Sequence, residues 1–177
     1  MAAPTFKPKT VYVAYIGATP EKVWEALTSP AFTRQWFSGL SAEIEGRAGG
    51  SFILRNAEGG VHIRGSVVEW EPPKRFSCTW TVEAFPAMRE LPECLVTYEI
   101  EPAGEAVRLT MTEAHSWDMP DAMLSGGRMG WPAFMSSLKS LLETGKALSI
   151  KMEPPKEMMA ALPEVLAAKP WLKQRSG

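Results

Sequence analysis

The sequence predicts an α+β domain in which an antiparallel sheet is covered by one long helix near the C-terminal end. Three observations lead to this fold class. Residues 41–114 consist of short runs with strand-type alternation, separated by turns rich in Gly and Pro. Residues 130–145 then carry apolar side chains at helical spacing. The chain of 177 residues is long enough for one domain with a substantial hydrophobic core.

The first predicted elements are a strand and two short helices. Residues 10–16 alternate and contain β-branched and aromatic side chains, which is typical of a strand. Thr19-Pro20 predicts a helix start, with Thr as the N-cap and Pro in the first turn. Ser29-Pro30 repeats this signal and predicts a second short helix. Each helix has an apolar pair four residues apart, namely Val23 with Leu27 and Phe32 with Trp36.

The central run contains the predicted sheet. Strands are expected near residues 41–45, 50–56, 60–71, 75–84, 93–101 and 106–114. Short turns between successive strands imply antiparallel pairing. Alternation gives the later strands one apolar face and one wetter face rich in Thr, Glu and Arg. The apolar face carries Phe76, Cys78, Trp80, Val82, Val96, Tyr98, Ile100, Val107, Leu109 and Met111.

The helix predicted over residues 130–145 is the most amphipathic segment of the chain. Its apolar stripe comprises Trp131, Phe134, Met135, Leu138, Leu141 and Leu142. Gly145 is a suitable end, because glycine adopts the left-handed backbone conformation without strain. Two interpretations stay open at this point: a helix packed into a solid core, or a lid above a ligand cavity.

The remaining chain divides into a domain at residues 1–148 and an extension at residues 149–177. Within the extension, Glu153-Pro154-Pro155 breaks the chain, and residues 156–168 predict a short helix that Pro163 could interrupt. The apolar side chains of this helix either pack on the domain or contact a second subunit, which would make the protein a homodimer.

Composition excludes several classes of protein. Lys and Arg total 19 and Asp and Glu total 20, which argues against nucleic acid as a partner. No apolar run is long enough for membrane insertion, and the N-terminal residues lack signal-peptide features. Two cysteines without metal-type spacing indicate a cytoplasmic protein with buried free thiols. Ten methionines suit an adaptable apolar interior.

The sequence offers little catalytic machinery, and we predict no metal, no cofactor and no assigned catalytic residue. The two histidines are His62 and His115. Glu113 and His115 would share a face if their strand continues that far, although His115 is expected at the strand end, exposed to water. A cavity carboxylate with a raised pKa could be contributed by one of the strand glutamates Glu69, Glu99 and Glu113.

Five segments, in order, resemble a known family. Residues 19–28, 32–37, 49–52 and 65–76 are similar to its first two helices and central hairpins. Residues 130–145, with Gly-Trp-Pro-Ala at the start and Leu-Leu-Glu-Thr-Gly at the end, resemble its C-terminal helix. The family is bacterial, is named after the activator of the heat-shock protein 90 ATPase, and belongs to the START-like (SRPBCC, helix-grip) superfamily. The resemblance covers residues 10–148.

The resemblance implies a helix-grip fold: a curved antiparallel sheet wrapped around the long C-terminal helix, with the two short helices closing one end. It also implies a cavity between the sheet and the helix, unless the same side chains fill that space. The predicted ligand-binding residues are Trp36, Phe52, Leu54, Val67, Trp80, Tyr98, Met111, Trp131 and Met135.

Three functional classes follow from this fold. The preferred hypothesis is binding of a small hydrophobic molecule in the cavity. The alternatives are an enzyme of the cyclase or hydrolase type that uses the same cavity, and a co-chaperone-like module that binds proteins. Convergent polar side chains in the cavity would favour the enzyme, and a purely apolar cavity would favour the binding protein.

Overall fold

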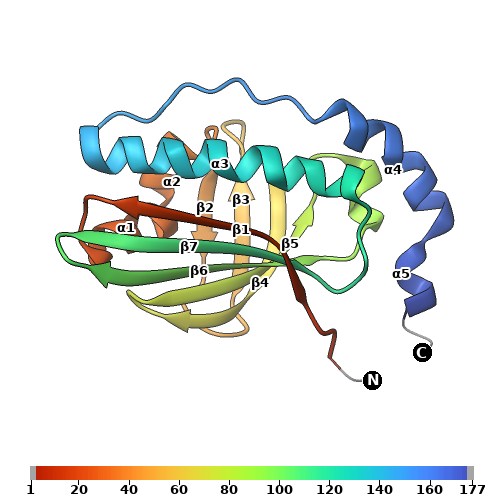
Figure 1. Cartoon of the computed structure of the whole chain (residues 1–177), viewed down its shortest axis with the longest axis horizontal. Coiled ribbons are helices and arrows are strands. Elements are labelled where there is room, and N and C mark those ends of the chain that lie inside the picture. Colours follow the sequence, from red (N-terminus) through yellow and green to blue (C-terminus); the bar gives the residue numbers. More distant parts are fainter. Residues whose placement is uncertain (1–2, 175–177) are drawn as a thin grey trace.

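The computed structural model describes residues 3–174 and shows one curved, seven-stranded antiparallel sheet (Figure 1). Its strand order is β1-β7-β6-β5-β4-β3-β2. The predicted α+β helix-grip fold is confirmed, and the predicted strands lie within a few residues of the observed ones. The strands are β1 (Lys7–Ile16), β2 (Ser41–Ile44), β3 (Ser51–Arg55), β4 (Val61–Glu71), β5 (Arg75–Val82), β6 (Cys94–Ala103) and β7 (Ala106–His115).

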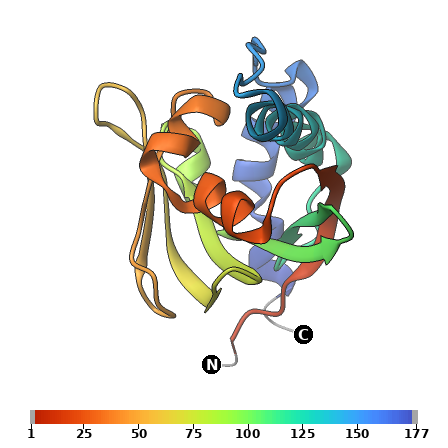
Figure 2. The same cartoon turned by 90° about the vertical axis from the view of Figure 1, so that its left-hand side faces the viewer.

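Two short helices, α1 (Pro20–Thr28) and α2 (Pro30–Trp36), close one end of the curved sheet (Figure 2). The Thr19 hydroxyl caps α1 by accepting a hydrogen bond from the backbone N–H of Lys22. The two helices are joined by the Trp36 indole, whose Nε1 donates to the carbonyl of Ala26 at 2.7 Å. This hydrogen bond fastens α2 to α1 at this end of the sheet.

The long helix α3 (Asp121–Thr144) crosses the concave face of the sheet. It has 24 residues and begins at Asp121, nine residues before the predicted start at residue 130. Gly145 ends it in the left-handed conformation, with φ of 78°. Its C-terminal half buries Met135, Leu138 and Leu141 in the main core, against side chains of the sheet and of α1.

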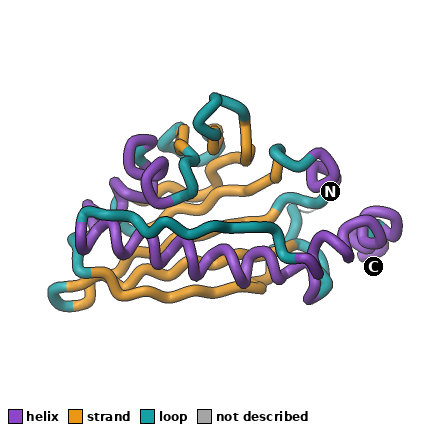
Figure 3. Tube along the Cα trace, turned by 90° about the horizontal axis from the view of Figure 1, so that it is seen from above, coloured by secondary structure: helices purple, strands orange, loops and turns teal. Residues whose placement is uncertain are grey.

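The chain after α3 turns back and runs along that helix (Figures 1 and 3). We call residues 146–155 the strap. The Ser137 hydroxyl fastens it to α3 by contacts with both the backbone N–H and the carbonyl of Leu148, at 3.2 and 3.3 Å. The strap leads to α4 (Lys156–Ala168) and α5 (Pro170–Lys173), and Pro163 does not interrupt α4.

Helix α4 packs on the domain through a second cluster of buried apolar side chains. We define the second cluster as Trp117, Met123, Met158, Leu162 and Val165. It joins the loop after β7 and the first turn of α3 to α4, apart from the main core. Residues 1–2 and 175–177 of the predicted domain and extension lie outside the described part of the chain.

The two ends of the described chain meet at Asp118. Lys9, in β1, forms an ion pair with its carboxylate at 3.8 Å. Gln174 donates to the same carboxylate and accepts from the Asp118 backbone N–H, both at 3.0 Å. Across residues 3–174, no helix combines the length and apolarity that crossing a membrane requires.

Candidate functional site

One hollow is larger than three others in the described part of the chain: it has a volume of ≈ 730 Å³ and largely apolar walls. It lies between the N-terminal half of α3, the ends of β5, β6 and β7, and the short 3-10 helix η1 (Pro86–Glu90). The strap and the start of α4 complete its wall. A volume of this size lies in the range typical of sites for small organic molecules.

Aromatic rings form one side of the cavity. Trp80, from β5, and Trp131, from α3, have ring centroids 5.4 Å apart. Phe37, at the end of α2, lies 5.9 Å from Trp80 and 4.5 Å from Phe134, again measured between centroids. All four side chains line the cavity, so a planar apolar molecule would meet aromatic faces and edges from three different elements.

Methionines form much of the remaining wall. Six of the ten methionines in the sequence line the cavity: Met88, Met119, Met123, Met129, Met152 and Met158. They come from η1, the loop before α3, α3 itself, the strap and α4. Unbranched thioether side chains adjust to differently shaped neighbours. This side of the cavity is therefore built from adaptable groups, whereas the opposite side is built from rigid rings.

A polar group of three side chains sits within these apolar walls. The Glu113 carboxylate contacts Nε2 of His115 at 2.8 Å, and it accepts a hydrogen bond from Nε1 of Trp131 at 2.5 Å. The side chains of Glu113 and His115 are 12% and 6% exposed. Nδ1 of His115 is buried and has no hydrogen-bond partner in residues 3–174. We call Glu113, His115 and Trp131 the polar triad.

Two glycines of α3 make room for this arrangement. A Cβ at Gly127 would lie 2.7 Å from Oε2 of Glu113, which is too close for the carboxylate to keep its position. A Cβ at Gly126 would lie 2.8 Å from the sulfur of Met158, at the end of a flexible side chain. Gly127 thus allows α3 to approach the polar triad, and Gly126 allows α4 to approach α3.

Strand register places a second buried polar atom close to the triad. Trp80, Cys94 and His115 are direct neighbours in one row across β5, β6 and β7. The indole Nε1 of Trp80 is buried without a hydrogen-bond partner among the described residues. Burial, reinforced by the nearby Glu113 carboxylate, raises the pKa of the Cys94 thiol far above its usual range. Cys94 is therefore held as a neutral thiol.

Two of the nine predicted ligand-binding residues line this cavity: Trp80 and Trp131. The other seven are buried in the main core, where side chains of the sheet, α1, α2 and α3 fill the space between them. These seven are Trp36, Phe52, Leu54, Val67, Tyr98, Met111 and Met135. The cavity thus occupies only one end of the interface between the sheet and α3.

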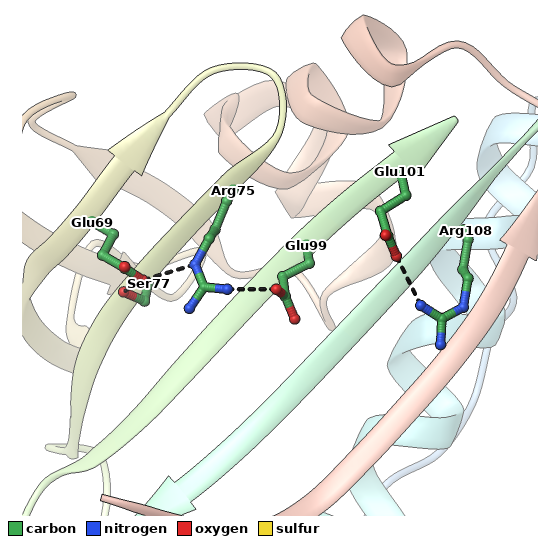
Figure 4. A network of polar contacts seen from close by, with 6 residues as sticks. All are labelled: Glu69, Arg75, Ser77, Glu99, Glu101 and Arg108. Atoms are coloured by element: carbon green, nitrogen blue, oxygen red, sulfur yellow. Dashed lines mark hydrogen bonds and ion pairs between the residues drawn. The ribbon is translucent and has the colours of Figure 1, made fainter. Parts of the chain in front are cut away.

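Of the three glutamates considered as cavity carboxylates, only Glu113 faces the cavity. Glu69 and Glu99 lie on the outer face of the sheet, on either side of Arg75 (Figure 4). The hydrogen bond from Arg75 lowers the pKa of Glu69, which is opposite to the expected effect for a cavity acid. A separate ion pair joins Glu101 and Arg108 on the same face.

The expected exposure of His115 is wrong. β7 continues to His115, and this residue is buried, with 5% of its surface exposed. Sequence reasoning also missed the cavity walls from η1, the strap and α4. One signal could have extended the prediction: Glu113 and His115 continue the alternation of Leu109 and Met111, so they belong to the face that α3 covers.

No group of three or more His, Cys, Asp or Glu side chains is placed to hold a metal ion within residues 3–174. Both cysteines are free thiols. Within the cavity, the polar triad and Trp80 offer hydrogen-bonding groups, and an imidazole such as that of His115 is able to accept or donate a proton.

Comparison with solved structures gives several proteins of the same fold. Protein MLL2253 from Mesorhizobium loti is 29% identical, with a TM-score of 0.61, over 76% of this chain and 97% of that chain. DynU16, from the dynemicin biosynthetic locus, is 28% identical, with a TM-score of 0.65, over 77% of this chain and 48% of its own. The Aha1 dimer from Colwellia psychrerythraea is 20% identical, with a TM-score of 0.60, over 77% of this chain and 97% of that chain.

None of the curated proteins compared with the sequence matches it. The family model described as Activator of Hsp90 ATPase homolog 1-like protein matches residues 17–143, from the loop before α1 to the last turn of α3. The match includes the sheet from β2 to β7 and both short helices, and it stops before the strap. This chain therefore belongs to the family of Activator of Hsp90 ATPase homolog 1-like proteins.

Proposed function

We propose that the protein binds a small, largely apolar molecule in the cavity between the sheet and the N-terminal half of α3. The observation that carries this proposal is the cavity itself, with a volume of ≈ 730 Å³ and walls of aromatic and methionine side chains. Sites for small molecules combine such walls with a few polar groups that orient the ligand. The polar triad supplies those groups.

The relatives support this proposal in a limited way. DynU16 is a protein of a biosynthetic locus, which is a setting rich in small organic molecules. The cavity wall contributed by the strap and α4 lies beyond the matched family region, which ends at residue 143. We infer that this extension adapts the ligand site of this chain, since it supplies Met152 and Met158 to the wall.

Thermal-shift measurements with a panel of apolar and aromatic compounds test the proposal. A ligand at 100 times its Kd stabilises the folded state by about 2.7 kcal/mol, and it raises the melting temperature accordingly. The change Val82→Trp should fill part of the cavity and abolish this shift, because Val82 lines it. Val68→Trp is the matched control, since Val68 is exposed on the neighbouring strand β4. A shift that survives Val82→Trp unchanged would place the ligand elsewhere.

An enzyme that uses the same cavity is the second candidate, and the contact between Glu113 and His115 favours it. A carboxylate that holds an imidazole is the usual arrangement for general acid–base catalysis. Nucleophilic hydrolysis is less well supported, because the raised pKa of Cys94 keeps this neighbouring thiol unreactive. We expect no strong ester or lactone hydrolysis. Robust turnover by the wild type that disappears in His115→Ala would establish the enzyme instead.

Two further proposals concern the state of the protein. Free cysteines support a cytoplasmic location.

A homodimer through the extension is supported by the exposed side chains of Met159 in α4 and Leu172 in α5, and by the Aha1 dimer of the same fold. Light scattering of the wild type and of a Met159→Glu, Leu172→Glu double variant tests the dimer. A monomeric wild type would exclude it at the concentration used.

A further inference from the structure

We propose that the cavity selects aromatic molecules that carry a hydroxyl group, and that this hydroxyl donates its hydrogen bond to Nδ1 of His115. The inference rests on the proposed function, because it names the chemistry of the ligand for the same cavity. It follows from the placement of protons in the polar triad and from two buried polar atoms of the cavity wall that find no hydrogen-bond partner within residues 3–174.

The protons of the triad are fixed by which groups can donate. The Trp131 indole can only donate, so its Nε1–H is committed to Oε2 of Glu113. As a carboxylate, Glu113 only accepts, so its other oxygen, Oε1, requires a proton on Nε2 of His115. A neutral imidazole with Nε2 protonated has a lone pair on Nδ1. Nδ1 of His115 is therefore a hydrogen-bond acceptor.

This acceptor is buried and unpaired, which is costly unless a ligand satisfies it. The His115 side chain is 6% exposed, it lines the cavity, and its Nδ1 has no partner in residues 3–174. A buried acceptor without a donor destabilises a protein, because it has lost its hydrogen bonds to water without replacement. An apolar ligand would leave this atom unpaired, whereas a hydroxyl would donate to it. The site thus discriminates between ligands by one hydrogen bond.

Trp80 adds the complementary group on the same wall. Its Nε1–H is a donor without a partner among the described residues, and Trp80 lies in one row with Cys94 and His115. A hydroxylated aromatic ring with a second oxygen can donate to His115 and accept from Trp80 while its faces contact the rings of Trp131 and Phe37. A molecule that offers only acceptors can satisfy Trp80, but it leaves Nδ1 of His115 unpaired.

The first test is independent of any ligand. Long-range ¹H–¹⁵N correlation spectra report which imidazole nitrogen carries the proton, and the sequence has only two histidines to assign. We expect Nε2–H and an unprotonated Nδ1 for His115 at pH 7.5. In Glu113→Gln, the amide oxygen keeps the bond from Trp131 and the amide NH₂ faces Nε2, so the proton should move to Nδ1. Glu99→Gln, on the outer face, is the control and should leave the tautomer unchanged. An Nδ1–H tautomer or an imidazolium in the wild type would overturn the inference.

The second test compares three probes that differ only at one substituent: 2-naphthol, 2-methoxynaphthalene and naphthalene. Titrations followed by the Trp indole N–H signals give each Kd. We expect 2-naphthol to bind about tenfold more tightly than either of the others, as one buried hydrogen bond predicts. In Glu113→Gln the preference for 2-naphthol over 2-methoxynaphthalene should be lost, because Nδ1 becomes a donor and the oxygen of either probe can accept from it. Glu99→Gln should preserve the wild-type order.

The outcomes separate the two proposals. Equal affinities for all three probes, with signal changes at the cavity tryptophans, would confirm a ligand cavity and refute selection by His115. Binding of none of the probes would contradict both proposals. Tighter binding of 2-naphthol that persists in Glu113→Gln would also refute the inference, because the preference would then not depend on the proton of His115.

Discussion

The two halves of α3 contact the same sheet in different ways. The C-terminal half, from Met135 to Leu141, is packed into the main core, and Leu138 has no exposed surface. The N-terminal half faces the cavity, the polar triad and the second cluster. One continuous helix thus holds the domain together at one end and leaves space at the other. Core packing and the wall of the cavity are thus supplied by separate turns of the same helix.

The difference is visible in the residues of the helix. The first half contains Gly126, Gly127, Gly130 and Pro132, all of which lower helix propensity. The second half has none of these and ends in Leu-Leu-Glu-Thr. Close neighbours explain Gly126 and Gly127, where a Cβ would lie 2.8 and 2.7 Å from Met158 and Glu113, but they do not explain Gly130. The two halves can therefore be distinguished by substitution.

The largest effect is expected from Leu138→Asp. An unpaired charge at this fully buried position of the main core should lower the free energy of unfolding by about 4 kcal/mol or more. Met129→Asp is the matched control on the cavity half of the same helix, where Met129 is 45% exposed, and it should change stability little. Urea denaturation measures both. Similar losses for the two variants would remove the distinction between the halves.

A smaller effect is expected from Leu162→Asp in the second cluster. Leu162 is buried on α4, so the charge should undock the extension, but the main core does not depend on it. The loss is therefore limited by the docking free energy of α4, about 2–3 kcal/mol for a helix with a few buried apolar side chains. Hydrogen exchange should accelerate across residues 150–173 and remain slow in β6 and β7. Faster exchange throughout the sheet would show that the clusters fold as one unit.

Gly127→Ala and Gly130→Ala sharpen the comparison within the cavity half itself. Alanine normally stabilises a helix relative to glycine by about 0.5–1 kcal/mol. Gly130→Ala should show this gain, because its Cβ would make only ordinary contacts, the nearest at 3.4 Å to Phe134. Gly127→Ala should instead lose about 1–2 kcal/mol, since its Cβ displaces the Glu113 carboxylate from its hydrogen bonds. Thermal unfolding of both variants measures the contrast, and a stabilised Gly127→Ala would mean that the triad tolerates movement.

The smallest effect is expected on the outer face. The pKa of Glu69 is lowered below its ordinary value of 4.5, mainly by the hydrogen bond from Arg75. A lowered pKa in the folded state contributes stability above pH 4.5 that is lost as the pH falls below it. The side chains of Glu69 and Arg75 are both well exposed, so their ion pair contributes no more than about 0.5–1 kcal/mol to the free energy of unfolding. In urea denaturation, the difference between the wild type and Glu69→Gln should be smaller at pH 3 than at pH 7.

Much of the fold could be predicted from the sequence, because alternation and turn residues are local signals. The strands, both short helices and α4 were predicted within a few residues. The first half of α3 was missed, since Gly126 and Gly127 indicate a flexible segment unless one knows that Glu113 and Met158 press against them. Trp80 and Trp131 were predicted on the cavity wall, whereas the contributions of η1 and the strap depend on contacts between distant segments.

The junction at Asp118, where Lys9 and Gln174 converge, has a consequence for protein engineering. Chain ends that lie together on the surface can be connected by a short linker, and new ends can be opened in an exposed turn. The turn at Gly59 is suitable, because it is exposed and Asn56, at the base of the same turn, lines the cavity. A circularly permuted protein cut at this turn would carry its new termini at the cavity rim. A fluorescent reporter attached there would convert occupancy of the cavity into a direct optical signal.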